Sequence, residues 1–244
     1  MNATPLWRRA VAEGLGTGLL VTVVVGSGIA AATLSPDDVG LQLLENSFAT
    51  ALGLAVLILM IGPVSGAHFN PVVSVVDWWL GRRSGTGLPA RDLTAYVPAQ
   101  IGGAVLGAVL ANLMYGETAV SWATTQRASG HLWLGEVVAT AGLIVLIFAL
   151  AASGRAVLAP AAVGAYIGSA YWFTSSTSFA NPAVTIGRAF SDTFAGIAPA
   201  SVPGFVIAQL AGAAVGVGLL ALLYPRAAQA ADEVVTPKEA GVSP

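Results

Sequence analysis

The sequence has no cysteine and few charged residues, and each shortage excludes a class of protein. Without cysteine there are no disulfides, no thiolate metal sites and no thiol nucleophile. Charged residues make up only 9% of the 244 positions, and hydrophobic residues make up 56%. An ordinary soluble domain carries about 25% charged residues. The composition is therefore typical of a protein whose solvent is lipid.

Basic residues and histidines are also scarce. A net charge of −2 and an isoelectric point near 5.6 leave no basic face for nucleic acid. His68 and His131 are the two histidines, too few for a metal-ligand cluster. No nucleophile can be matched with a general base. We therefore expect no enzyme activity, no bound metal and no nucleic-acid partner.

Six runs contain no Asp, Glu, Lys or Arg, and each is long enough to cross a hydrocarbon core of about 30 Å as a helix of roughly 20 residues. The runs are 14–36, 46–67, 93–116, 137–154, 156–187 and 193–225. The sequence predicts an all-α membrane protein with six transmembrane helices. We expect a single domain over residues 1–226 and a disordered cytoplasmic tail over 227–244.

The distribution of basic residues predicts the orientation. Arg8 and Arg9 precede the first run as in a signal peptide, but that run is of spanning length and has Glu13 near its start, so we expect an uncleaved first helix. Six spans place both termini on one side, with eight of the ten Lys and Arg residues. Arg127 and Arg188 fall on the other side. The positive-inside rule then predicts cytoplasmic termini in the inner (cell) membrane.

The two halves of the chain, about 8–116 and 131–226, repeat each other in order. The repeated pairs are Glu13 and Glu136, Asn70-Pro71 and Asn181-Pro182, and Gln100 and Gln209. Three spans per half is an odd number, so the second half enters the membrane from the opposite side. An inverted repeat of this kind places a transport site at the symmetric interface near the midplane.

Glycines follow both glutamines at similar spacing. Gly102, Gly103 and Gly107 lie in the third span, and Gly212 and Gly216 in the sixth. Small residues four apart allow helix backbones to approach closely. Glycine is also common in membrane helices in general. The paired placement favours close packing.

The segments Asn70-Pro71-Val72 and Asn181-Pro182-Ala183 each predict the start of a short helix, because asparagine is a strong N-cap and proline suits the first turn. About ten residues cover roughly half of the hydrocarbon core, so each segment enters and returns as a re-entrant half-helix. Broken backbone at membrane depth requires surrounding protein or a water-filled cavity. The sequence therefore predicts an internal lumen.

Two half-helices that enter from opposite faces bring their N-termini together. Each N-terminus carries about half a positive charge, which opposes cations and protons. We expect the side-chain oxygens of Asn70 and Asn181 to cap their own helices and their amide hydrogens to meet a passing solute. The arrangement predicts a passive channel for small uncharged solutes that excludes ions.

These residues make the chain similar to the major intrinsic protein family, the aquaporins and aquaglyceroporins, over 13–224. The stretch 65–71 resembles the first family signature, with Val72 in place of alanine. The resemblance implies a homotetramer with one pore per protomer and no cofactor. It also implies that Glu13 and Glu136 hold the re-entrant loops, although buried carboxylates can relay protons, and that His68 lends its backbone carbonyl to the lumen.

The family's outer selectivity filter uses four positions, which family spacing places at Thr50, Ser169, Ser178 and Val184. Water-selective members have Phe, His, a small residue and Arg there. The ring in this chain is wide, with hydroxyls and one apolar wall, which favours glycerol-like polyols. A valine at the arginine position resembles the bacterial aquaglyceroporin branch associated with arsenic-resistance operons. This resemblance adds neutral trivalent arsenicals to the expected solutes, and no cysteine is present to trap them.

Two nearby residues leave alternatives. Phe48 restores an aromatic to the filter if the register is off by two. Arg188 either substitutes for the missing filter arginine or, as we favour, caps the C-terminal end of its half-helix.

Two other functions compete with a channel. An ion-coupled secondary transporter also uses inverted repeats and broken helices, but apart from Glu13 and Glu136 its spans would lack ionisable residues. A non-conducting membrane junction or scaffold protein is the second alternative.

Overall fold

The computed structural model describes residues 4–82 and 85–225, and every regular element in these ranges is a helix. Six helices have the length and hydropathy of membrane spans. They are α1 (Leu6–Leu34), α2 (Val39–Ser65), α4 (Ala90–Met114), α5 (Gly130–Ala152), α6 (Ala159–Phe173, preceded by a 3-10 turn at Ala156–Leu158) and α8 (Val202–Leu223, preceded by one at Pro199–Ser201). The predicted fold class is confirmed.

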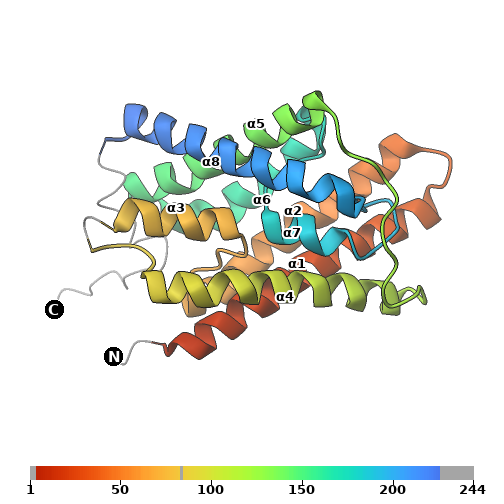
Figure 1. Ribbon diagram of the computed structural model, residues 1–244, viewed down its shortest axis with the longest axis horizontal. Coiled ribbons are helices and arrows are strands. Elements are labelled where there is room, and N and C mark those ends of the chain that lie inside the picture. The colour runs from red at the N-terminus through yellow and green to blue at the C-terminus, as the bar shows by residue number, and fades with distance from the viewer. Residues whose placement is uncertain (1–3, 83–84, 226–244) are drawn as a thin grey trace.

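Two short helices complete the bundle and correspond to the predicted half-helices. They are α3 (Pro71–Gly81) and α7 (Pro182–Arg188). Figure 1 shows α3 extending toward the end of the bundle where α1 begins and α8 ends, while α7 extends toward the opposite end. Their N-termini meet in the middle of the bundle. The predicted disordered tail lies outside the described residues.

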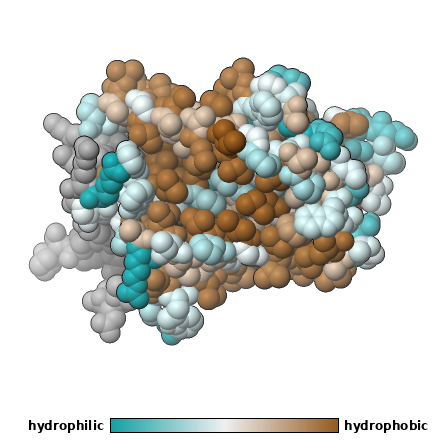
Figure 2. All heavy atoms as spheres, viewed as in Figure 1, coloured by the Kyte–Doolittle hydropathy of each residue, from teal (hydrophilic) through white to brown (hydrophobic). Residues whose placement is uncertain are grey.

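The spans are apolar on the side that faces outward. Large apolar side chains are exposed on all six, for example Leu52, Leu106 and Leu222. In Figure 2 hydrophobic residues cover much of the middle of the visible face, and hydrophilic residues gather toward its two ends. This banding is what a bilayer with an apolar core requires, and the chain is an integral membrane protein.

Glycines allow α1 to contact α4 and α5 to contact α8 at backbone distance. A Cβ built on Gly103 would lie 1.9 Å from the carbonyl oxygen of Gly14, and one built on Gly107 would lie 2.0 Å from that of Gly18. The packing interpretation of these glycines holds, because any side chain would push the helices apart. Gly102, by contrast, has nothing within 4 Å of its Cβ position.

The second pair of helices shows the same device. A Cβ on Gly212 would lie 2.6 Å from the carbonyl oxygen of Val137, and one on Gly216 would lie 2.9 Å from that of Ala141. The inverted repeat predicted from the sequence is therefore visible in how each half packs its first span against its third.

The segment between α4 and α5, residues 115–129, crosses one end of the bundle as an extended chain (Figure 1). It pairs with the segment after α7, where Ala123 N donates to Ala189 O at 3.0 Å and Ala198 N donates to Thr125 O at 2.8 Å. Arg127 N donates to Ser201 Oγ at 2.9 Å. These bonds hold Arg127 close to the end of α7.

Candidate functional site

Each asparagine caps its own half-helix, as predicted. Asn70 Oδ1 accepts from Val72 N at 3.0 Å. Asn181 Oδ1 accepts from Ala183 N at 3.0 Å and from Val184 N at 3.2 Å. Proline follows each asparagine at the first helical position, where a missing N–H leaves nothing unpaired.

The two asparagines also bond across the junction between the half-helices, which the sequence did not predict. Asn70 Nδ2 donates to Ala180 O at 2.8 Å, and Asn181 Nδ2 donates to Phe69 O at 2.7 Å. A carboxamide nitrogen carries two hydrogens, so each asparagine uses one within the protein. The expectation that both amide hydrogens meet the solute is corrected to one.

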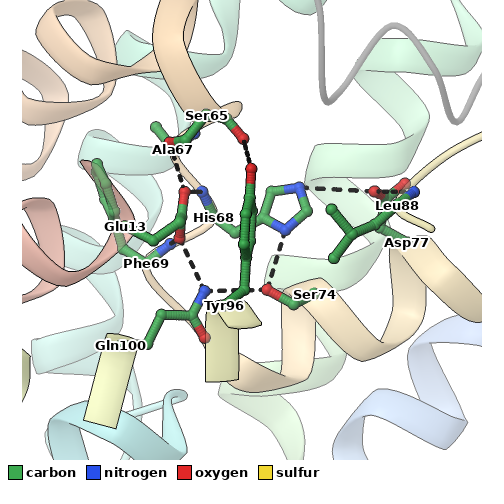
Figure 3. Close-up of polar contacts among 10 residues, drawn as sticks. All are labelled: Glu13, Ser65, Ala67, His68, Phe69, Ser74, Asp77, Leu88, Tyr96 and Gln100. Carbon is green, nitrogen blue, oxygen red and sulfur yellow. Dashed lines mark hydrogen bonds and ion pairs between the residues drawn. The ribbon is translucent and has the colours of Figure 1, made fainter. Parts of the chain in front are cut away.

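Glu13 holds the loop before α3, as Figure 3 shows. Its carboxylate accepts from Ser65 Oγ at 2.7 Å, from His68 N at 3.0 Å and from Phe69 N at 2.7 Å, and Gln100 Nε2 donates to it at 2.8 Å. Phe69 has a φ of 51°, in the left-handed region, so its amide cannot join a regular helix. The carboxylate satisfies buried backbone donors that would otherwise be unpaired.

Glu136 does the same for the loop before α7. Phe179 N and Ala180 N each donate to its carboxylate at 2.8 Å, and Gln209 Nε2 donates at 2.7 Å. Ala180 has a φ of 49°. Both carboxylates are buried and committed to internal hydrogen bonds. This geometry favours the structural role over a proton relay.

His68 contributes more than a backbone carbonyl. Its Nδ1 lies 3.0 Å from Ser74 Oγ, its Nε2 lies 3.6 Å from Asp77 Oδ2, and its ring meets Tyr96 edge-on at a centroid distance of 5.7 Å. Figure 3 shows the imidazole between Tyr96 and Asp77. Asp77 in turn accepts from Leu88 N at 2.9 Å. No group of three metal-ligating side chains occurs in the described part of the chain.

A cavity of about 390 Å³ passes the junction of the half-helices. His68, Asn70, Asn181 and the loop backbone give it polar atoms. Apolar side chains from the spans form much of the remaining wall, and they include Leu20, Val24, Leu54, Leu143, Val163 and Ile167. The cavity wall thus has both polar and apolar parts.

Three of the four predicted filter residues, Thr50, Ser178 and Val184, line this cavity. Ser178 Oγ is buried and has no hydrogen-bond partner among the described residues. Phe48 is 64% exposed and faces away from the bundle. On α2, Thr50 therefore faces the cavity and Phe48 does not.

Ser169 does not line the cavity. It is exposed, and its hydroxyl donates to Tyr166 O in the same helix at 2.8 Å. Tyr171 is buried at the cavity, with its hydroxyl 3.2 Å from Thr50 Oγ1. A shift of two residues turns a side chain by roughly 200° around an α-helix. The spacing therefore placed the α6 position on the wrong face, and an aromatic hydroxyl occupies the wall instead.

Arg188 also lines the cavity, although we expected it to cap α7. Its guanidinium carbon lies 3.4 Å from the centroid of the Phe179 ring, and its Nε donates to Ala195 O. Arg188 also lines a second cavity of about 190 Å³, together with Arg127, Tyr171 and Phe194. Burial lowers the pKa of Arg127, while Glu136 and Tyr171 act in the opposite direction.

Six spans around two half-helices, with a cavity passing the point where those half-helices meet, define a membrane channel. Comparison with known proteins identifies the family. The model of the major intrinsic protein family matches residues 1–178 and 173–243. The chain belongs to the major intrinsic protein family.

Relatives match over nearly their whole length. An aquaglyceroporin AqpS of Rhizobium meliloti (strain 1021) is 49% identical over 226 residues, covering 92% of this chain and 94% of its own. A glycerol uptake facilitator protein of Pseudomonas aeruginosa is 31% identical, covering 93% and 94%. The X-ray structure of the aquaglyceroporin from Plasmodium falciparum has a TM-score of 0.68 at 19% identity, covering 93% of this chain and 100% of that one. That structure supports the fold alone.

Proposed function

We propose that the protein is a passive channel for small uncharged solutes, chiefly glycerol-like polyols together with water, and that it excludes ions and protons. The observation that carries this proposal is the meeting of two asparagine-capped half-helix N-termini at one cavity, bonded to each other through Asn70 and Asn181. A 49% identical aquaglyceroporin supports it.

The barrier to cations follows from the two helix ends. Each presents about half a positive charge, and each asparagine keeps one N–H for a solute. A hydroxyl oxygen accepts such a hydrogen bond, whereas a cation has no lone pair to offer and would give up its hydration shell between two positive ends. Uncharged molecules with hydroxyl groups therefore pass at lower cost.

The size of the solute depends on the outer part of the pathway. Val184 offers neither a hydrogen-bond donor nor a charge, and Ser178 and Thr50 are hydroxyl-bearing residues of the same cavity wall. A wall with hydroxyls on one side and apolar groups on the other matches a polyol, which has both kinds of surface. Neutral trivalent arsenicals share this chemistry, and we include them in the proposed solute class.

The same proposal covers assembly and topology. We propose a single channel domain over residues 1–226, a homotetramer with one pore per protomer, and an inner-membrane location with both termini in the cytoplasm. The structure places the start of α1 and the end of α8 at one end of the bundle (Figure 1). Arg127 and Arg188 belong to the opposite end, consistent with an excess of basic residues on the cytoplasmic side.

Stopped-flow light scattering on proteoliposomes tests the function. Vesicles with the protein should respond faster than empty vesicles to gradients of water, glycerol and neutral arsenite, and flux should rise linearly with gradient. Saturation at low concentration, or dependence on an ion gradient, would indicate a secondary transporter instead. No acceleration with any solute would support a scaffold role.

A further inference from the structure

The inverted repeat extends beyond the asparagines to the residues on either side of them. The offset of 111 that relates Asn70 to Asn181 also relates His68 to Phe179 and Asp77 to Arg188. In both halves the residue seven past the asparagine returns to the residue two before it. His68 Nε2 lies 3.6 Å from Asp77 Oδ2, and the Arg188 guanidinium lies 3.4 Å from the Phe179 ring centroid.

The second half therefore repeats the geometry of the first with the opposite charge. A planar guanidinium over an aromatic face is held by cation–π attraction as well as by packing. Its Nε is fixed by the bond to Ala195 O. Arg188 is thus a cation in one orientation, only 2% exposed to solvent.

The terminal nitrogens of Arg188 have no hydrogen-bond partner in the described part of the chain. Apart from the Nε bond, no hydrogen bond or ion pair of its guanidinium is found among the described residues. The Glu136 carboxylate accepts from Phe179 N, Ala180 N and Gln209 Nε2, and no ion pair joins it to Arg188 among the described residues. The donors of Arg188 therefore remain for the cavity that it lines.

Arg188 lies where the walls of the two cavities meet. Tyr171 and Arg188 line both the main cavity and the outer one. A solute that moves between the cavities passes these two side chains. Val184, which also lines the main cavity, has no charge and no side-chain donor.

We propose that Arg188 is the specificity-determining cation of the outer constriction, reaching the pathway from the last turn of α7 while Phe179 holds its guanidinium flat. It donates hydrogen bonds to oxygen atoms of an uncharged polyol or weak acid and repels cations before they reach the asparagines. The proposal rests on the channel function proposed above and names the residue that gives it selectivity.

The test compares Arg188→Met with Arg188→Lys in proteoliposomes at equal protein amount. Methionine keeps most of the length but removes charge and donors, and it should raise the leak of protons and Na⁺ above that of the unmodified channel. The ratio of glycerol to water permeability should change about tenfold, the effect of one charge-assisted hydrogen bond. Lysine should preserve cation exclusion but lose discrimination among solutes, because it lacks the planar set of donors.

Arg155→Met is the matched control, since Arg155 is exposed at the other end of the bundle, and it should behave as the unmodified channel. Unchanged ion leak and an unchanged permeability ratio in folded Arg188→Met would overturn the inference. If that variant does not fold, Phe179→Leu removes the aromatic face and keeps the charge, and unmodified selectivity there would overturn it equally. Absence of flux in the unmodified protein would instead refute the proposed function.

Discussion

The contact between α1 and α4 yields a quantitative prediction for Gly103→Ala. The new methyl group would lie 1.9 Å from Gly14 O and 2.7 Å from the Gly14 carbonyl carbon. Ordinary van der Waals contact begins near 3.4 Å, and both clashing atoms belong to backbone that cannot rotate away. The two helices must therefore separate by more than about 1 Å at the closest point, which loosens the dispersion contacts on either side.

The expected magnitude combines two opposing effects. Forcing an extra methyl group into a packed contact costs about 1–3 kcal/mol, whereas alanine gains up to about 1 kcal/mol over glycine in a helix interior. Gly102→Ala is the matched control, one residue away with nothing within 4 Å of its Cβ position. The control should be neutral or slightly more stable, so the two variants should differ by about 1–3 kcal/mol in the free energy of unfolding.

The measurement is denaturant unfolding in mixed micelles, followed by near-ultraviolet circular dichroism. Gly102→Ala should keep its oligomeric state in size-exclusion chromatography. Gly103→Ala should unfold at a lower denaturant concentration and should conduct solute more slowly. Equal midpoints for the two variants would refute the reasoning, because they differ only in whether the methyl group meets backbone.

Three further predictions concern the pathway. Val184→Arg should reduce glycerol flux more than water flux in stopped-flow assays, by narrowing the outer constriction, and equal reduction of both would contradict it. Asn181→Leu should lose the bond to Phe69 O and lower conduction at least tenfold; undiminished flux in well-folded protein would remove Asn181 from the pathway. Glu13→Ala should leave two buried amides unpaired and destabilise the protein by several kcal/mol, which thermal unfolding would detect.

The arrangement of spans could be predicted because charge is expensive in lipid and is therefore confined to the ends and loops. The first and last residues of the helices were harder to predict from the sequence. The first charge-free run begins at Gly14, whereas α1 begins at Leu6, because Arg9 pairs with Asp92 of α4 and Glu13 is satisfied by a loop. The run 156–187 has no charge anywhere, so nothing in composition marks the end of α6 at Phe173.

The half-helices could be predicted because their signal is local. An asparagine followed by proline defines a helix start through its own backbone. The bonds from Asn70 to Ala180 O and from Asn181 to Phe69 O join residues more than 100 positions apart. No local pattern contains them, so the way in which the two helix ends are held together could not be predicted from the sequence.

The direction of the side chains in the filter was the feature that was hardest to predict from the sequence. The loop after α6 has left-handed backbone at Thr177, Ser178 and Ala180, and such residues change the path of the chain without changing its length. Counting back from Asn181 therefore reached Ser169 on the exposed side of α6 instead of Tyr171 at the cavity. The predicted role of Arg188 as a cap at the C-terminal end of α7 also depended on side-chain direction, because its side chain turns back along α7 to Phe179.

The inverted repeat also determines how ions of opposite sign are treated. The two half-helix ends and Arg188 all present positive charge to the pathway. This charge repels cations but attracts anions.

Anions must then be excluded by another mechanism. The wall beyond the asparagines includes Leu54, Val163 and Ile167, none of which donates a hydrogen bond. An anion that leaves Arg188 exchanges charge-assisted bonds for an apolar surface, and removing an ion from water costs several kcal/mol even after relaxation. A neutral hydroxylated solute gives up much less. In the proposed channel, electrostatics rejects cations and desolvation rejects anions, which leaves uncharged molecules as the class that we propose the pathway conducts.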